Sequence, residues 1–160
     1  MRAIGLDLGT KTGYAWTTDG KVRAELSGVS DFPPRRYEGG GMRFLRFRRF
    51  LVALVDDPED CVIFFEEVAA QAHRSGNAAH IYGGFLGVLS EFCEGHSVPF
   101  RGLPVGTIKK HATGIGNAGK PAMLARACTQ FGHVDSEDAA DALWTLSLGL
   151  KEMGENDGDF

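Results

Sequence analysis

The sequence lacks any long apolar run, because no stretch reaches the roughly 18 residues that a membrane-spanning helix requires. The N-terminus also lacks the basic region, apolar segment and cleavage site of a secretory signal. We therefore expect a cytoplasmic protein with no membrane partner. The chain has 160 residues, 43% hydrophobic and 24% charged, which is the size and composition of one ordinary globular domain.

Paired cysteines and clustered histidines are also lacking. Cys61, Cys93 and Cys128 are odd in number, far apart and without CxxC spacing. None of the five histidines stands at a zinc-ligand spacing from a cysteine or another histidine. We expect neither a disulfide framework nor a zinc site, and the cysteines are interpreted as reduced core residues.

An excess of positive charge, which nucleic-acid binding proteins usually show, is absent from the chain as a whole, because its net charge is −4. The last ten residues, KEMGENDGDF, hold four acids and one base, so residues 1–150 carry 16 basic and 17 acidic side chains. Bound divalent cations would neutralise four of those acids if they are metal ligands, as argued below. The remaining surface would then be basic overall, and a nucleic-acid partner is compatible with the composition.

The order of apolar runs and turn residues predicts one α/β domain over residues 1–150, with an acidic, disordered tail at 151–160. Three strands open the chain at 2–8, 14–18 and 21–29, and Asp19-Gly20 favours a tight hairpin between the second and third. A loop follows at 31–41. The later elements alternate: helix 42–56, strand 61–65, loop 69–76, helix 77–95, strand 98–101, helical turn 104–112, loop 113–119, and helices 120–131 and 136–150. The pattern predicts a mixed five-stranded sheet, a three-strand antiparallel meander followed by strand-helix units, flanked by helices.

Two acids stand at the ends of strongly apolar strands. Asp7 ends the first strand, and a buried carboxylate there is costly unless it is paired or binds a metal; capping of the following turn is an equally plausible role for it alone. Glu66 and Glu67 end the strand FFEEV. Neighbouring strand residues point to opposite faces, so only one of these two glutamates can lie beside Asp7.

A second pair of acids lies in the segment SEDAADALW. Asp138 and Asp141 are three residues apart and share one helical face. Their position near a helix start also suits simple complementation of the helix dipole, with Ser136 as N-cap. That reading explains Asp141 less well, because this residue stands among apolar neighbours.

Two strand-end acids and an acid pair on a helix are the oxygen ligands that a pair of Mg²⁺ ions, or Mn²⁺ in their place, requires in a phosphodiesterase. The sequence also resembles the RuvC-type Holliday-junction resolvases of the RNase H-like superfamily. The resemblance runs through GLDLGTKTGYA, FFEEV, TIKKHATGIGNAGK and DAADAL, and covers most of residues 1–150.

The resemblance implies an RNase H-like fold and a homodimer that cuts four-way DNA junctions with paired symmetric nicks and leaves 5′-phosphate ends. It implies that Asp7, Glu66, Asp138 and Asp141 are the catalytic metal ligands, and it favours Glu66 over Glu67. Around Gly114-Ile115-Gly116 it places functional lysines at Lys109 and Lys120, which would otherwise be ordinary surface residues. Lys120 would supply positive charge beside the scissile phosphate.

The sequence departs from the family after the catalytic glutamate, where an aromatic is replaced by Val68-Ala69-Ala70 and a longer loop with His73 and Arg74. Arg74 is a candidate DNA contact. The segment 35–49 holds six arginines against one acid, so Arg43 and Arg46 are further candidates; a solvated helix face is an equally plausible role for them.

Three other functions remain open. The start GLDLGTK also occurs in nucleases that process ribosomal RNA precursors, and DLGTKTG resembles the phosphate loop of actin-like ATPases, which need two such domains. A junction-binding module without cleavage is the third, although all four acids are present.

For the dimer, the apolar helix 77–95 is the candidate interface. Its apolar residues are Ile81, Phe85, Val88, Leu89 and Phe92, and its small ones are Gly83, Gly84 and Gly87.

Overall fold

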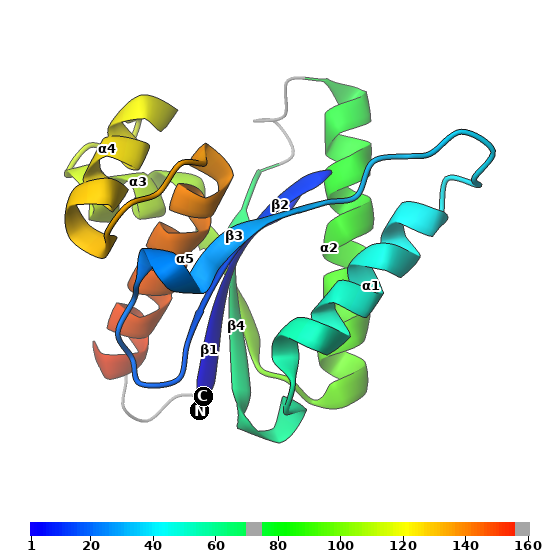
Figure 1. Cartoon of the computed structure of the whole chain (residues 1–160), viewed down its shortest axis with the longest axis horizontal. Coiled ribbons are helices and arrows are strands. Elements are labelled where there is room, and N and C mark those ends of the chain that lie inside the picture. The colour runs from blue at the N-terminus through cyan, green and yellow to red at the C-terminus, as the bar shows by residue number, and fades with distance from the viewer. Residues whose placement is uncertain (70–74, 156–160) are drawn as a thin grey trace.

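The computed structural model describes residues 1–69 and 75–155, which form a mixed sheet with helices on both faces (Figure 1). The strands are β1 (Arg2–Asp7), β2 (Lys11–Thr17), β3 (Ser27–Asp31), β4 (Cys61–Glu67) and β5 (Phe100–Pro104), in the order β3-β2-β1-β4-β5. The α-helices are α1 (Met42–Val55), α2 (Gly76–His96), α3 (Val105–Thr113), α4 (Lys120–Phe131) and α5 (Glu137–Glu155). The expected α/β fold, an antiparallel meander followed by parallel strands, is confirmed.

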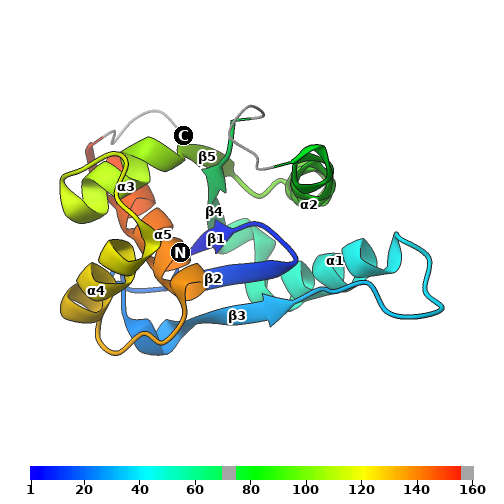
Figure 2. The same cartoon turned by 90° about the horizontal axis from the view of Figure 1, so that it is seen from above.

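The helices form two layers, one on each face of the sheet (Figure 2). On one face α3, α4 and α5 lie over a core that includes Phe64, Leu143 and Trp144. On the other face α1 and α2 lie over a core rich in phenylalanine. Phe85, Leu89 and Phe92 of α2 are fully buried in this second core. These three side chains pack within the chain, so the prediction that they form part of a dimer interface is wrong.

The close approach of α5 to the sheet depends on glycines. A Cβ atom at Gly13 of β2 would overlap the backbone of Asp138, and one at Gly5 of β1 would overlap the backbone of Ala142. Gly149 makes the reciprocal contact, because its Cβ would collide with the ring of Phe64 on β4. The N-terminal half of α5, which carries the predicted acids, therefore lies directly on the central strands.

The connection between β2 and β3 differs from the predicted tight hairpin. The Asp19 carboxylate accepts hydrogen bonds from the Thr17 hydroxyl, the Lys21 amide and the Arg23 guanidinium. The chain then makes a 3-10 turn over Ala24–Leu26, and β3 starts only at Ser27. Gly20 has a positive φ, but Asp19 is not among the residues with one, so a type I′ turn does not form. The capture of Asp19 by its own neighbours is the physical reason.

Other boundaries differ from the expectation as well. Strand β2 begins at Lys11, three residues earlier than predicted, and β4 and β5 continue to Glu67 and Pro104 instead of ending at residues 65 and 101. Strand β5 begins at Phe100, two residues later than predicted, and α5 continues through Glu155 instead of ending near residue 150. Residues 151–155 of the expected tail are therefore helical, and residues 156–160 lie outside the described residues. None of the helices in residues 1–69 and 75–155 is long and apolar enough to cross a membrane.

The packing of α5 generates the first testable prediction. Gly13→Ala should lower the free energy of unfolding by about 1–3 kcal/mol, because the new methyl group displaces the start of α5 from β2. Gly95→Ala is the matched control. Apart from the backbone of α2 itself, no heavy atom of the described residues lies within 4 Å of a Cβ at this position, so alanine should stabilise the helix by up to about 1 kcal/mol. Urea unfolding of both variants measures the difference, and equal stabilities would contradict the packing argument.

Candidate metal centre

Three carboxylates meet where the central strands end. Oxygen atoms of Asp7, Glu66 and Asp141 lie within 4.8 Å of one another. The three residues come from β1, β4 and α5, and they line a cavity of about 160 Å³. Residues distant in the sequence are thus brought together at the C-terminal ends of the neighbouring parallel strands β1 and β4.

Strand register explains why Glu66 rather than Glu67 joins Asp7. In the parallel pairing of β1 with β4, Leu6 lies opposite Phe65, and both side chains belong to the core beneath α1 and α2. Side chains alternate along a strand, so the next pair, Asp7 and Glu66, faces α5. Glu67 belongs to the opposite, α2 side of β4. The choice that the resemblance favoured is therefore supported by the register itself.

Asp141 reaches the cluster because of its place on α5. Ser136 caps the helix: its hydroxyl accepts a hydrogen bond from the Ala139 amide at 3.4 Å, and its carbonyl accepts one from Ala140. Asp141 follows in the second turn, on the face that packs against the sheet, and its side chain is buried. The helix thus presents a carboxylate to the strand ends instead of to solvent.

The electrostatics of the cluster are unfavourable without a counter-charge. Burial raises the pKa of Asp7 well above its ordinary value, and the neighbouring Glu66 and Asp141 carboxylates raise it further. Burial, and then Asp141, raises the pKa of Glu66. Burial also raises the pKa of Asp141, although Lys120 opposes the shift. Oxygen ligands crowded in this way suit a hard divalent cation, so the cluster fits a divalent-metal site.

Lys120, the first residue of α4, places its positively charged ammonium group beside the carboxylates. Its Nζ lies 3.4 Å from Asp141 Oδ2 and 3.5 Å from Asp138 Oδ1. Burial lowers the pKa of Lys120, but the carboxylates of Asp141, Asp7 and Asp138 together outweigh that effect, and the pKa is raised. The side chain therefore stays charged beside the acids.

Lys109 of α3 lines the same cavity. Its charge contributes to lowering the pKa of both Glu66 and Asp141, against the larger effect of burial. Both lysines predicted around the glycine-rich segment 113–119 thus flank the carboxylates.

Asp138, the fourth predicted ligand, is not a member of the three-carboxylate cluster in this structure. It lies at the start of α5, one turn before Asp141, and its carboxylate contacts Lys120 instead. The helix thus presents both acids to Lys120, but only Asp141 lines the cavity.

Arg43 and Arg46, predicted as DNA contacts, have partners within the chain. Arg43 is buried, and its guanidinium donates hydrogen bonds to the Phe32 carbonyl and the Thr10 hydroxyl. Arg46 donates to both carboxylate oxygens of Glu38 at 2.7 Å. These contacts occupy the groups with which the two arginines would bind a phosphate. His73 and Arg74 lie outside the described residues.

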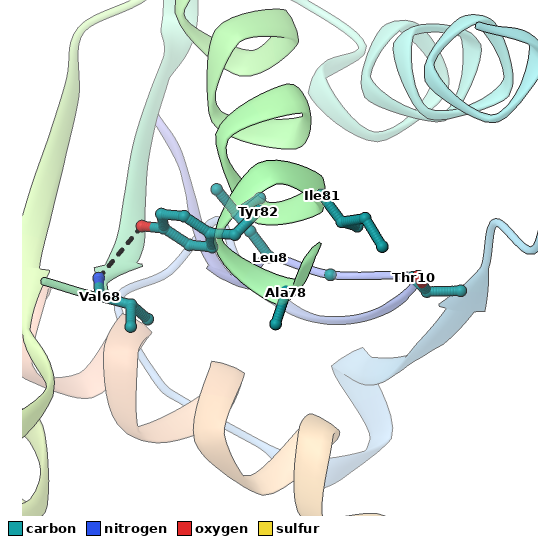
Figure 3. A pocket seen from close by; sticks show the side chains of 7 residues that line it. Leu8, Thr10, Val68, Ala78, Ile81 and Tyr82 are labelled. Carbon is teal, nitrogen blue, oxygen red and sulfur yellow. Dashed lines mark hydrogen bonds between the residues drawn. The ribbon is translucent and has the colours of Figure 1, made fainter. Parts of the chain in front are cut away.

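A supporting residue that the sequence did not reveal is Tyr82 of α2. Its hydroxyl donates a hydrogen bond to the Glu66 carbonyl and accepts one from the Val68 amide, across a pocket beside the strand ends (Figure 3). Burial raises the pKa of Tyr82, so the hydroxyl keeps the proton that it donates. The tyrosine ties the backbone at Glu66 to α2. Its position in an apolar helix offered no signal for this role.

Comparisons with known proteins identify the fold. No protein-family model matches the chain, and a search of curated proteins found no similar sequence. Among solved structures it is similar to "T. thermophilus RuvC in complex with Holliday junction substrate", at 21% identity and a TM-score of 0.76 over 96% of both chains. It is also similar to the Thermus thermophilus RuvC structure, at 22% identity and a TM-score of 0.76 over 96% of this chain and 97% of the other. The similarity extends over nearly the whole chain and shows a RuvC-like, RNase H-like fold.

The raised pKa values predict how stability depends on pH in excess chelator. At a pH below the ordinary range of aspartate, Asp7 is protonated whether the chain is folded or not, and Asp7→Asn should change little. As the pH rises from that range through the raised folded-state pKa, the wild-type protein loses stability because it must bury another negative charge. At pH 8 Asp7→Asn should therefore melt about 2–4 °C higher, which is about 1 kcal/mol for a domain of this size.

The control for this experiment is Asp135→Asn, which alters an exposed aspartate and should change the melting temperature little at either pH. Added Mg²⁺ or Mn²⁺ should raise the melting temperature of the wild type more than that of Asp7→Asn. A stability difference between Asp7→Asn and the wild type that does not grow with rising pH in chelator, or a variant that responds equally to the metals, would argue against the metal centre.

Proposed function

We propose that this protein is a structure-selective DNA endonuclease that resolves four-way DNA junctions by metal-dependent hydrolysis of phosphodiester bonds, in DNA recombination, repair or phage DNA processing. The observation that carries the proposal is the cluster of Asp7, Glu66 and Asp141 at the ends of the central strands of a RuvC-like fold. One of the two similar structures is a complex with a Holliday junction, which is the substrate that we propose here.

The chemistry proposed for the site uses two Mg²⁺ ions, or two Mn²⁺ ions in their place, held by Asp7, Glu66 and Asp141 with Asp138 as a fourth ligand. Bound there, the ions would activate water and stabilise the charge that develops on the phosphate. The protein supplies the rigid frame: two strand ends and one helix fix the ligands before the substrate arrives. Cleavage would leave 5′-phosphate ends.

The lysines provide the positive charge for the substrate. Lys120 contacts two carboxylates that would bind metal, so its ammonium group can turn to the scissile phosphate once cations neutralise those acids. Lys109 borders the same cavity and is proposed to bind a neighbouring phosphate. Arg74 remains a predicted DNA contact, whereas Arg43 and Arg46 would reach DNA only by giving up their internal hydrogen bonds.

A nuclease acting on ribosomal RNA precursors is the second candidate, because the same carboxylate cluster would serve either polymer. The lysine-flanked glycine segment and the closing DAADAL favour the junction nuclease. A purely binding role would not explain why three carboxylates are crowded at this site.

Paired cleavage of a symmetric junction calls for a symmetric dimer, and we propose that it forms along α1 and α2. A groove of about 320 Å³ lies between these helices, with Phe44, Leu45, Gly84 and Val88 among its lining residues. Leu45 and Val52, seven residues apart on α1, are both about half exposed. This stripe and groove form an apolar surface that a second copy of the chain can cover.

The test of the activity is incubation with labelled four-way, forked and linear DNA and with an RNA precursor stem, in Mg²⁺ and in chelator. Wild-type protein should nick the four-way DNA in Mg²⁺ alone. Asp7→Asn, Glu66→Gln and Asp141→Asn should each reduce nicking more than about a hundredfold, because each removes a metal ligand that stabilises the transition state by several kcal/mol. Junction binding should survive, because Lys109 and Lys120 are untouched.

Glu67→Gln provides the matched control for the nicking assay, since Glu67 stands beside Glu66 but faces the other side of β4. It should keep near-normal activity. Activity that is lost in Glu67→Gln and retained in Glu66→Gln would show that the site lies on the α2 side of β4 and not on the α5 side. Robust cleavage in chelator would exclude the metal mechanism. Preferential cleavage of the RNA stem would favour the second candidate.

The test of the dimer is sedimentation at micromolar concentration. Wild-type protein should be a dimer, and Leu45→Asp should give a folded monomer that makes single nicks but loses coupled paired cleavage. Gln130→Asp, which changes the exposed surface of α4, should leave the dimer intact. A monomeric wild type that still makes coupled paired nicks would refute the symmetry argument.

A further inference from the structure

The loop between β3 and α1, residues 32–41, carries an unusual aromatic side chain. Tyr37 is 92% exposed, the largest value among the exposed large hydrophobic residues. Its φ is +70°, in the left-handed region where a side chain other than that of glycine is strained. The chain has three glycines just downstream, yet a tyrosine occupies this position. The structure thus holds an aromatic ring in solvent at a cost in stability.

Both sides of this loop are fixed to the body of the protein. Arg46 of α1 binds the Glu38 carboxylate after the tip and also donates a hydrogen bond to the Pro33 carbonyl before it, at 2.6 Å. Arg43 holds the Phe32 carbonyl at the start of the loop. The two arginines that were expected to grip DNA directly therefore brace the loop that presents Tyr37.

The groups beside the ring suit a nucleic acid. The Arg36 guanidinium lies over the Tyr37 ring, 5.1 Å from its centroid. Arg35 and Arg36 are exposed, and neither forms a salt bridge with any residue in the described part of the chain. Arg46 already pairs with Glu38, the acid next to them. One face of an aromatic ring, with the Arg36 guanidinium over the other and the exposed Arg35 two residues away in the chain, matches a base and its flanking phosphates.

The loop starts at the same end of the sheet as the carboxylate cluster, where β1, β3 and β4 all terminate. The Phe32 amide donates a hydrogen bond to the Thr10 carbonyl, three residues after Asp7. From there the loop extends past the first turn of α1, on the side of the molecule opposite α3 and α4 (Figures 1 and 2). A DNA molecule with one strand at the carboxylates and another arm across α1 would meet this loop.

We propose that Tyr37 stacks on an unpaired base of the DNA substrate while Arg35 and Arg36 bind the adjoining phosphates, an inference that rests on the proposed function. The faces of bases inside a duplex are covered by their neighbours, so the ring finds a partner only where bases are exposed. An opened four-way junction exposes them and an intact linear duplex does not. The loop is then a determinant of substrate choice that is separate from the hydrolytic site.

The experiment compares Tyr37→Gly and Tyr37→Phe with the wild type in Ca²⁺, which supports binding without the geometry that hydrolysis requires. Fluorescence anisotropy would be measured with a four-way junction and with a linear duplex of the same sequence. Tyr37→Gly should bind the junction on the order of tenfold more weakly, with unchanged affinity for the duplex. Tyr37→Phe keeps the ring and should bind as the wild type does.

Two further measurements separate stacking from other causes. Tyr37→Gly relieves the backbone strain, so its melting temperature should equal or exceed that of the wild type, and a loss of binding cannot then be due to unfolding. A junction with 5-iodouracil at its centre should photo-crosslink to a peptide that contains Tyr37. Arg36→Gln should weaken binding to both DNAs and reduce the salt slope by about one, as expected for a lost phosphate contact.

The outcomes distinguish this inference from the proposed function. A wild type that prefers the junction and nicks it, beside a Tyr37→Gly variant with the same preference, overturns the stacking role alone. So does an equal fall in affinity for both DNAs, or a Tyr37→Gly variant that changes from dimer to monomer, which would make the loop a protein contact. A wild type with neither junction preference nor nicking overturns the proposed function and this inference together.

Discussion

Mutual repulsion among three crowded and partly buried carboxylates is the constraint to which the rest of the structure is adapted. Asp7, Glu66 and Asp141 hold oxygen atoms within 4.8 Å of one another, and burial makes each harder to ionise. Such a cluster opposes folding unless protons or cations compensate it. The chain tolerates it because the elements that carry the acids are held by extensive apolar packing, with the sheet between two separate cores.

The same constraint accounts for the surroundings of the cluster. Lys120 and Lys109 supply positive charge from helices that belong to the α5 layer. Gly5 and Gly13 allow α5 to approach until its acid reaches the strand ends. Tyr82 secures the backbone of Glu66 from the opposite layer. The carboxylate cluster is thus supported by residues from the helices on both faces of the sheet.

Much of this arrangement could be predicted from the sequence, because the strongest signals are local. Helices α1 and α4 and strand β4 follow from apolar periodicity and from glycine and proline boundaries. The resemblance selected Glu66, but only strand register gives the physical reason. The partners of individual side chains left no such trace: the Asp19 carboxylate binds Arg23, which removes the expected hairpin, and the buried Arg43 donates a hydrogen bond to the Phe32 carbonyl. An arginine that braces a loop and one that binds phosphate look alike in a sequence.

The two-layer arrangement has a consequence for how such a molecule can change. The carboxylates and lysines belong to the central strand ends and to the α3, α4 and α5 layer, whereas the groove between α1 and α2 and the loop bearing Tyr37 belong to the other layer. The sheet therefore separates the carboxylates and lysines from the groove and the loop. Substitutions on the exposed side of α1 and in the loop before it can accumulate without disturbing the carboxylate cluster, whereas Tyr82 of α2 must be kept because it holds the backbone at Glu66. Under the proposed function, a lineage or a protein engineer could change the DNA shape that such a scaffold binds by altering one side of the sheet.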